Sequence, residues 1–486
     1  MPNREAGHLF LAAHEGPCGR TGQTFAVRRR SRSQPLAKNL PFATAAGPEL
    51  GKPRLVMTTA TNGSYSPSEP AMLRERPGPV NRHYNGNMNE NTAQTALPQI
   101  HLKNSWTSRH PWIFQKLVEK PVQRPKPGTL VDIIGNDGLW TARGFYNGHS
   151  RISLRLLERD ADIAVDAAWF SRKIAEAVSL RRDVLKLDAV SNAWRVVHSE
   201  GDGLSGLVVD RYDDLLVVEY FSAGMFRYRE WIYAALREQF PGCRFHAFAD
   251  EHVQKQESFD FRGTEPAAPA VITEYGIKFR ADPAGAHKTG FFADQRDNRE
   301  WLSHQCAGKR VLDLCCNTGG FGVYAAARGA SEVVGIDIDD NVLEIAKANA
   351  KLNMPFQSSV RPRFVQADIF PWLRDAANAG EQFDVVILDP AKMTRDREQI
   401  IPALKKYLDM NKLAMGVVKP GGLFATFSCT GLVSEEQFLD AVRRAAYYAG
   451  RTVQVLKVAG AGADHPWLTD VQESRYLKAM FCRVVD

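Results

Sequence analysis

The turn that follows Asp313 has the residue types and spacing of a site for a nucleoside-bearing ligand. An apolar run ends at Asp313 and leads into Gly319 and Gly320, where the backbone can approach a ligand closely. A second apolar run ends at Asp337, 24 residues after Asp313, and its carboxylate can accept hydrogen bonds from both hydroxyls of a ribose. Two acids around one glycine-rich turn predict a nucleoside-bearing cofactor at the carboxyl ends of parallel strands.

The glycine pattern distinguishes between two classes of cofactor. A dinucleotide site carries Gly-x-Gly-x-x-Gly around a pyrophosphate, and that pattern is absent from this turn. Because there is no pyrophosphate to hold, S-adenosylmethionine fits the turn better than a dinucleotide does. A simple turn and a helix-capping acid would give the same residues without any ligand, so the rest of this half of the chain has to be considered.

Two further apolar runs, at 364–368 and 383–389, also end in acids. Helical patterns lie between and after the strands, at 321–329, 340–352, 370–379 and 396–417. Strands that alternate with helices predict an α/β fold with a doubly wound parallel sheet, in which the acids reach one edge. At that edge we expect Asp313 to hold the methionine amino group of the cofactor and Asp368 to meet the adenine amino group.

Length, apolar content and cysteine usage limit the class of protein. The 486 residues exceed the usual size of one domain, so two or three domains are expected. No uninterrupted apolar run is long enough to cross a bilayer, and the amino terminus lacks a secretory pattern. The seven cysteines include no Cys-x-x-Cys pair, which argues against a disulfide framework or a zinc site. These features predict a cytoplasmic protein that binds no metal and no membrane.

The positive charge of the chain is concentrated near its amino terminus. Residues 1–97 contain 12 Lys or Arg and 6 Asp or Glu, whereas the remaining residues are close to neutral. The same segment is poor in apolar periodicity, so we predict a basic, disordered extension at 1–96. The arginine-rich run at 28–32 could contact RNA, but a solvated tail, an organelle transit peptide or a start codon assigned too early would explain the segment equally well.

Ordered structure is expected from Leu97 onward, in three domains. Short strands at 130–134, 139–146 and 151–157, joined by turn residues, predict a small β-domain at 97–160. An α+β domain is predicted at 161–270 and the cofactor domain at 271–486. The elements expected in the α+β domain are helices at 161–185 and 226–239 and strands at 194–198, 206–210, 215–221 and 244–249.

Several separated motifs resemble those of one family, the class I S-adenosylmethionine-dependent ribosomal RNA large subunit methyltransferase I enzymes, which form 5-methylcytosine. The matching motifs lie at 109–112, 201–211, 287–299, 318–321, 427–431 and 463–466. The resemblance implies a PUA RNA-binding domain, a central α+β domain and a Rossmann-like methyltransferase domain between Leu97 and Asp486. It also implies RNA as the partner, with large-subunit ribosomal RNA as the expected substrate. A homodimer is a candidate assembly.

The resemblance assigns roles to particular residues. It implies that Cys429, in Phe-Ser-Cys-Thr-Gly, is the thiolate that adds to C6 of a cytosine so that C5 can take a methyl group. Asp389 is expected to hydrogen-bond the base or to take part in proton transfer, and Lys288 and Gln295 fall in the segment that covers the cofactor. Position alone would also allow Cys429 to be a small buried residue and Asp389 to be a helix cap.

One motif departs from the family pattern. The family usually reads Asp-Pro-Pro-Lys-Phe after the fourth strand, whereas this chain reads Asp-Pro-Ala-Lys-Met at 389–393. The loss of the second proline and of the aromatic residue argues against methylation of an exocyclic amine, and it leaves the target base open. Two alternatives therefore remain. One is a methyltransferase that acts on another RNA base or on a small molecule, and the other is a non-catalytic RNA-binding assembly factor.

Overall fold

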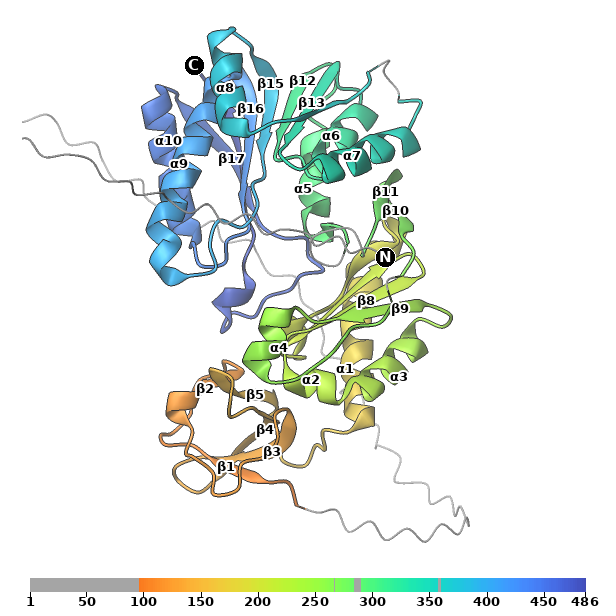
Figure 1. Ribbon diagram of the computed structural model, residues 1–486, viewed down its shortest axis with the longest axis vertical. Coiled ribbons are helices and arrows are strands. Elements are labelled where there is room, and N and C mark those ends of the chain that lie inside the picture. The colour runs from red at the N-terminus through yellow and green to blue at the C-terminus, as the bar shows by residue number, and fades with distance from the viewer. Residues whose placement is uncertain (1–95, 266, 284–289, 357–359) are drawn as a thin grey trace, which may run out of the picture. The chain divides into compact units, whose positions relative to one another are not determined.

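The computed structural model describes residues 96–265, 267–283, 290–356 and 360–486 (Figure 1). The predicted amino-terminal extension, apart from its last residue, and Lys288 lie outside these residues. The described part of the chain forms sheets of five, four and seven strands and one two-stranded hairpin. Over the same residues, no helix is both long enough and apolar enough to cross a membrane.

The first sheet along the sequence has five strands, in the order β1-β3-β4-β5-β2. Its strands are β1 (Gln99–His101), β2 (Trp112–Phe114), β3 (Thr129–Ile134), β4 (Trp140–Tyr146) and β5 (Ile152–Glu158). The three strands predicted here are confirmed, with ends that differ by one residue. The core of this sheet includes Val131, Ile133, Ala142 and Leu154, all fully buried.

The central α+β unit contains a four-stranded sheet with the order β6-β7-β8-β9. Its strands are β6 (Ala193–His198), β7 (Leu207–Tyr212), β8 (Leu215–Tyr220) and β9 (Arg244–Phe248), which confirm the four predicted strands. Its helices are α1 (Ala167–Ser179), α2 (Ala223–Arg227), α3 (Arg229–Gln239) and α4 (Glu251–Glu257).

Two helix predictions in this unit were wrong in their limits. The helix predicted at 161–185 begins only after Asp166, whose carboxylate accepts a hydrogen bond from Trp169 N and caps α1, and it passes into a π-helical turn at Leu180–Val184. The helix predicted at 226–239 is broken at Tyr228, which separates α2 from α3. At Asp166 a side-chain cap overrides the apolar period, and at Tyr228 a local change of backbone angles does so.

The seven-stranded sheet of the carboxyl-terminal half has the order β14-β13-β12-β15-β16-β18-β17. Its strands are β12 (Arg310–Leu314), β13 (Glu332–Asp337), β14 (Arg363–Gln366), β15 (Phe383–Leu388), β16 (Val418–Ser428), β17 (Val453–Ala459) and β18 (Lys478–Val484). The first five run parallel, and β18 pairs with β16 and β17 in the antiparallel sense. The order reverses between β12 and β15, which is where open α/β sheets bind ligands. The predicted doubly wound sheet is therefore confirmed.

Helices cover both faces of this sheet (Figure 1). They are α5 (Arg296–Ser303), α6 (Gly320–Ala327), α7 (Asp340–Leu352), α8 (Ile369–Asn378), α9 (Ile400–Gly416) and α10 (Glu435–Ala449). One core joins alternate strand residues such as Leu312 and Leu388 to α8, α9 and α10, and a second joins Val311 and Ile387 to α5 and α6. Because apolar side chains are buried on both faces, the polar groups of these strands can reach solvent mainly at the strand ends.

A hairpin of β10 (Ala270–Glu274) and β11 (Ile277–Ala281) lies between the two larger units in the chain. Its buried residues Ile272 and Phe279 pack in one cluster with Tyr324 of α6 and with Tyr212 of β7. The hairpin therefore contributes to a continuous apolar contact between the central unit and the elements of the seven-stranded sheet.

Candidate active site at the carboxyl edge of the parallel sheet

The turn between β12 and α6 holds an uncommon backbone conformation. Cys315 and Asn317 have positive φ angles of 57° and 48°, and Gly319 follows at 77°. A non-glycine residue in this region costs roughly 1–3 kcal/mol, so the surrounding structure has to impose the geometry. Part of that restraint comes from Asp337, whose Oδ2 accepts a hydrogen bond from Asn317 N at 2.9 Å. Such strained turns cluster at ligand sites, which supports this turn as the candidate cofactor loop.

The glycines of the loop are required by packing as well as by conformation. A Cβ on Gly319 would lie 3.0 Å from Ala346 Cβ and 3.1 Å from the ring of Phe364. A Cβ on Gly320 would lie 3.2 Å from Arg299 Cδ. The sequence interpretation assigned these glycines to close approach of a ligand, and the structure adds that the loop itself packs against α7 and β14 through Gly319.

Asp313 is a buried carboxylate with one unused oxygen. Its Oδ2 accepts a hydrogen bond from Gly322 N at 2.9 Å, while Oδ1 has no partner in the described residues. Burial raises the pKa of Asp313 to about 8, and the nearby carboxylates of Asp389 and Asp337 act in the same direction. A buried acid of this kind needs a cation or a donor beside it. The amino group of a bound S-adenosylmethionine would supply both, so the residue fits that cofactor.

Asp337 is the last residue of β13, and Asp368 lies two residues after the end of β14. Asp337 Oδ1 accepts a hydrogen bond from Asp339 N at 3.1 Å, so both of its oxygens already hold backbone amides. Each oxygen keeps a second lone pair with which it can accept a ribose hydroxyl. Asp368 is exposed and caps α8 through Phe370 N at 2.9 Å. Helix capping therefore accounts for part of the Asp368 signal.

Asp389 follows β15 and lies beside Gln295. Gln295 Nε2 donates a hydrogen bond to Asp389 Oδ2 at 3.0 Å, and Gln295 Oε1 accepts one from Asn298 Nδ2 at 2.7 Å. Gln295 is itself almost fully buried. These contacts allow Gln295 to orient the Asp389 carboxylate, and its predicted place over the cofactor stays a prediction.

Cys429 follows β16, the strand that pairs with β15, and this pairing brings it next to the Asp389 loop. Its Sγ lies 3.8 Å from the carbonyl oxygen of Pro390, and the residue is half-buried. The two loops are joined by Thr430, whose Oγ1 accepts a hydrogen bond from Met393 N at 3.0 Å and lies 2.8 Å from the hydroxyl of Tyr407. A thiol and a carboxylate of neighbouring strands therefore share one edge with the candidate cofactor loop.

The other described cysteines occupy poorer environments for a nucleophile. Burial is the largest cause that raises the pKa of each of their thiols: Cys243, Cys306, Cys315, Cys316 and Cys482. The carboxylates of Asp337, Asp389, Asp313 and Asp368 add to this effect at Cys315. A thiolate is disfavoured at all five positions.

Asp464 and His465 lie in a different cluster. Asp464 is fully buried and forms hydrogen bonds to both terminal nitrogens of Arg296, at 3.0 and 3.2 Å, and to Arg195 N at 2.9 Å. His465 Nδ1 lies 3.1 Å from Asp464 Oδ1. Burial would raise the pKa of Asp464, but His465 and Arg296 hold it well below its ordinary value. This cluster joins β6 of the central unit to α5 beside the seven-stranded sheet, so a structural role accounts for the motif.

Three features near the edge were not predicted. Ile338, directly after Asp337, is 69% exposed and offers an apolar surface beside the predicted ribose acid. Tyr407 of α9 supports the Cys429 loop through Thr430, and Lys478 of β18 donates to the Thr430 carbonyl oxygen at 2.7 Å. Only Ile338 could have been found from the sequence, as an apolar residue directly after the acid that ends a strand. Tyr407 and Lys478 belong to elements that are distant in the sequence from Thr430.

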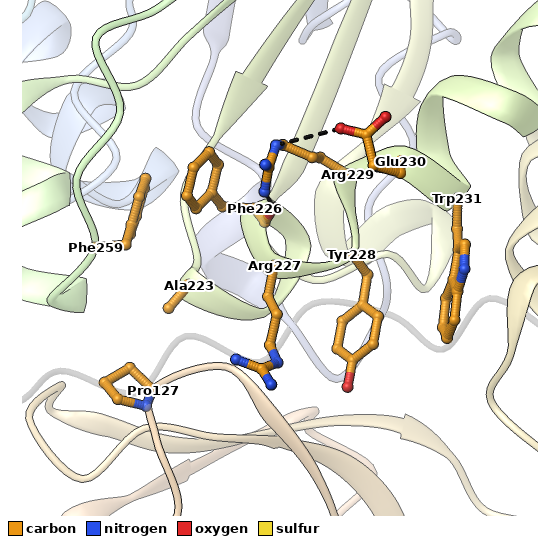
Figure 2. Close-up of a pocket in the computed structure, with 9 residues that line it drawn as sticks. All are labelled: Pro127, Ala223, Phe226, Arg227, Tyr228, Arg229, Glu230, Trp231 and Phe259. Atoms are coloured by element: carbon orange, nitrogen blue, oxygen red, sulfur yellow. Dashed lines mark hydrogen bonds and ion pairs between the residues drawn. The ribbon is translucent and has the colours of Figure 1, made fainter.

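A separate hollow of about 630 Å³ lies between α2, α3 and the loop before β3 (Figure 2). It is lined by Pro127, Ala223, Phe226, Arg227, Tyr228, Arg229, Glu230, Trp231 and Phe259. The guanidinium of Arg229 lies 4.6 Å from the ring centre of Phe226, and Arg227 extends toward Pro127. None of these residues comes from the carboxyl edge, so the hollow is separate from the candidate active site.

Comparison with known proteins agrees with this geometry. Residues 243–483 match a family described as S-adenosylmethionine-dependent methyltransferase, and residues 101–159 match a PUA-like domain. The chain is 40% identical over 387 residues to ribosomal RNA large subunit methyltransferase I of Aeromonas hydrophila, covering 78% of this chain and 97% of the relative. It is 39% identical over 397 residues to the protein of that name from Tolumonas auensis, covering 80% and 99%.

Solved structures share the fold at lower identity. A crystal structure of the methyltransferase SMU.776 complexed with SAH superposes with a TM-score of 0.67 at 18% identity, over 80% of this chain and 100% of that chain. A Streptococcus mutans protein assigned as a SAM-dependent methyltransferase gives a TM-score of 0.66 at 17% identity, over the same shares. At this identity the likeness concerns the fold alone.

Proposed function

Because the chain belongs to the ribosomal RNA large subunit methyltransferase I family, we propose that it forms 5-methylcytosine in large-subunit ribosomal RNA through a covalent adduct on Cys429. The enzyme is an S-adenosylmethionine-dependent methyltransferase that acts on RNA. The observation that carries the finer proposal is the position of Cys429, with Sγ 3.8 Å from Pro390 O in the loop that begins with Asp389.

The chemistry requires a nucleophile because cytosine C5 is too weakly nucleophilic to attack a methyl sulfonium. The Cys429 thiolate forms a bond to C6, and the electron density that builds up at C5 takes the methyl group. A base then removes the C5 proton, the S–C6 bond breaks, and the thiolate leaves. The bound S-adenosylmethionine supplies the electrophilic methyl group.

The residues of the carboxyl edge are proposed to have two roles, to bind the cofactor and to contact the target base. Asp313, Asp337 and the turn through Gly319 are proposed to hold the cofactor, with Asp368 at its adenine end. Asp389, oriented by Gln295, is proposed to hydrogen-bond the target base or to accept its proton. For Lys288, which lies outside the described residues, the cofactor contact remains a proposal from the sequence.

The RNA side of the proposal rests on the PUA-like domain and on the aromatic hollow. Guanidinium groups and aromatic rings stack on unpaired bases, and Arg227, Tyr228 and Trp231 line the hollow beside that domain. A target cytosine in paired RNA would have to be flipped out of its helix before C6 could reach Cys429. We keep the domain boundaries 97–160, 161–270 and 271–486 as part of this proposal.

A specific departure favours a second candidate, methylation of another RNA base. Ala391 and Met393 replace the proline and the aromatic residue that the family pattern carries, and Ala391 is exposed at the edge of the loop. Two side chains of the loop after Asp389 therefore differ from the family pattern, and we propose that this surface takes part in the choice of base.

Mapping of ribosomal RNA by mass spectrometry tests the proposal. RNA from a strain that lacks the gene should lose one 5-methylcytosine in the large-subunit RNA, and the wild-type gene should restore it. RNA that carries 5-fluorocytosine at the mapped site should become trapped on the wild-type enzyme, because fluorine blocks the final elimination. Loss of a methyl group from a nitrogen or an oxygen instead would favour the second candidate.

Two finer points belong to the same proposal. None of the six described cysteines forms a disulfide, and we propose that the enzyme works in the reducing cytoplasm. A homodimer is the proposed assembly. Light scattering after gel filtration tests it, and a mass close to the 54.1 kDa of one chain would contradict it.

A further inference from the structure

Lys478 is a buried lysine beside the loop that carries Cys429. It begins β18, where its Cα pairs with Ser428, the residue directly before Cys429. Its ammonium donates hydrogen bonds to the carbonyl oxygen of Thr430 at 2.7 Å and to that of Tyr476 at 2.8 Å. The hydrogen bond to Thr430, the residue after Cys429, therefore holds the Lys478 side chain beside Cys429.

The ammonium has no carboxylate partner. Within the described residues, no Asp or Glu oxygen lies within ion-pair distance of Lys478, although the residue is only 3% exposed. The charged groups that influence it are Cys429 and Glu435, which favour its charged form, and Arg475 and Lys392, which oppose it. Glu435 is itself paired with Arg475. A buried cation without a counter-ion is costly, unless an anion is supplied during function.

We propose that Lys478 is a positioning residue that stabilises the thiolate of Cys429 and so raises the fraction of active nucleophile. The inference rests on the proposed role of Cys429 as the nucleophile. The thiol releases its proton to solvent before the adduct forms, and Lys478 keeps its own protons throughout. The same ammonium then receives the thiolate back when the S–C6 bond breaks.

The protonation of Lys478 sets a pH window for this effect. Burial lowers the pKa of Lys478 to about 8, and the Cys429 thiolate opposes that shift. The ammonium is present below this pH and is lost above it, so its stabilisation of the thiolate should be greatest in the neutral range. Substitution should therefore change the pH profile of Cys429, whereas a purely structural lysine would leave that profile unchanged.

The test measures the alkylation rate of Cys429 by iodoacetamide from pH 5 to pH 10, resolved peptide by peptide by mass spectrometry. In the wild type we expect an apparent thiol pKa below the ordinary value of about 8.5. Lys478→Met removes the charge but keeps the length, and it should raise the apparent pKa of Cys429 by about 1 unit or more. Lys478→Arg keeps the charge and should stay close to the wild type.

Three controls separate this inference from its alternatives. The melting temperature and the S-adenosylmethionine affinity of each variant report folding, and the alkylation of Cys315 should not change. A wild-type Cys429 pKa at or above about 8.5, or an unchanged profile in a folded Lys478→Met protein, would overturn the inference. The absence of a 5-fluorocytosine adduct, with the alkylation shift intact, would overturn the proposed function of Cys429 instead.

Discussion

The two halves of the carboxyl edge are the cofactor loop and the loop that carries Cys429, and each holds a buried ionisable group whose charged form has no oppositely charged partner in the described residues. On the cofactor side, Asp313 is a buried acid with an unpartnered oxygen and a pKa raised by burial to about 8. On the transfer side, Lys478 is a buried base whose pKa burial lowers to about 8, with no carboxylate partner among the described residues. The comparison suggests that each group lacks a partner within the chain because its partner is a reactant: a cationic cofactor for Asp313 and a thiolate for Lys478.

Two other buried ion pairs of the described residues are compensated within the chain. Arg296, at the start of α5, and Asp464, between β17 and β18, form a pair with two hydrogen bonds of 3.0 and 3.2 Å. Arg181 and Asp202 form a similar buried pair. The structure therefore satisfies buried ions where the role is structural, and the exceptions at the edge support a functional interpretation.

The largest effect is expected from Cys429→Ala. The variant should lose methyl transfer entirely and should bind S-adenosylmethionine with nearly unchanged affinity, because the thiol acts on the base and not on the cofactor. Single-turnover assays with the mapped RNA and calorimetric titration measure the two effects. Cys316→Ala is the matched control, for which turnover should persist. Near-normal methyl transfer by Cys429→Ala would remove the covalent route.

A smaller loss is expected from Asp337→Ala on the cofactor side. The variant loses the acceptors for the ribose hydroxyls and for two loop amides, and each charge-assisted hydrogen bond contributes roughly 1.5–3 kcal/mol. Affinity for S-adenosylmethionine should therefore fall at least about 10-fold, measured by calorimetry. Asp340→Ala, an exposed position at the start of α7, should change little. An unchanged affinity in Asp337→Ala would show that the ribose lies elsewhere.

Asp313→Asn should separate stability from binding. The folded protein keeps a proton on Asp313 between about pH 4 and pH 8 that the unfolded chain releases, so its stability falls as the pH rises through this window. The amide avoids this loss and can still accept the hydrogen bond from Gly322 N. At pH 8 the cofactor-free variant should therefore melt at a higher temperature than the wild type, while binding S-adenosylmethionine about 10-fold more weakly.

The pH dependence provides the check on this prediction. The difference in melting temperature between Asp313→Asn and the wild type should grow from pH 5 to pH 8. A constant difference would mean that Asp313 is ionised throughout, and the contrast between the two halves of the edge would then lose its cofactor side.

The smallest effect is expected from removal of residues 1–90. Both halves of the edge are built from residues between Ala293 and Val484, so the melting temperature and the cofactor affinity should stay within experimental error. RNA affinity would fall, with a shallower salt dependence, only if the arginine run at 28–32 contacts phosphates. A large fall in melting temperature after truncation would show that this segment stabilises the rest of the protein.

Much of the site was predictable because its signals are local in the sequence. Each acid of the edge stands at or near the end of an apolar run that is visible in the sequence, and parallel strands bring such ends to one edge by topology alone. Helix limits were less predictable: Asp166 begins α1 several residues later than the apolar period indicates, and Tyr228 breaks a predicted helix in two. These outcomes depend on caps and backbone angles that a periodicity does not encode.

The sequence by itself therefore determined the α/β class and, through its motifs, the family, and it supplied the acids of the edge, the glycine turn and Cys429 as candidate site residues. Only the tertiary structure decided how these residues are partnered. It joined Gln295 to Asp389 across 94 positions and Lys478 to Thr430 across 48. The physical reason is that burial and electrostatic pairing depend on contacts between distant segments. The pKa shifts of Asp313 and Lys478 therefore arise only once the sheet and its helices have assembled.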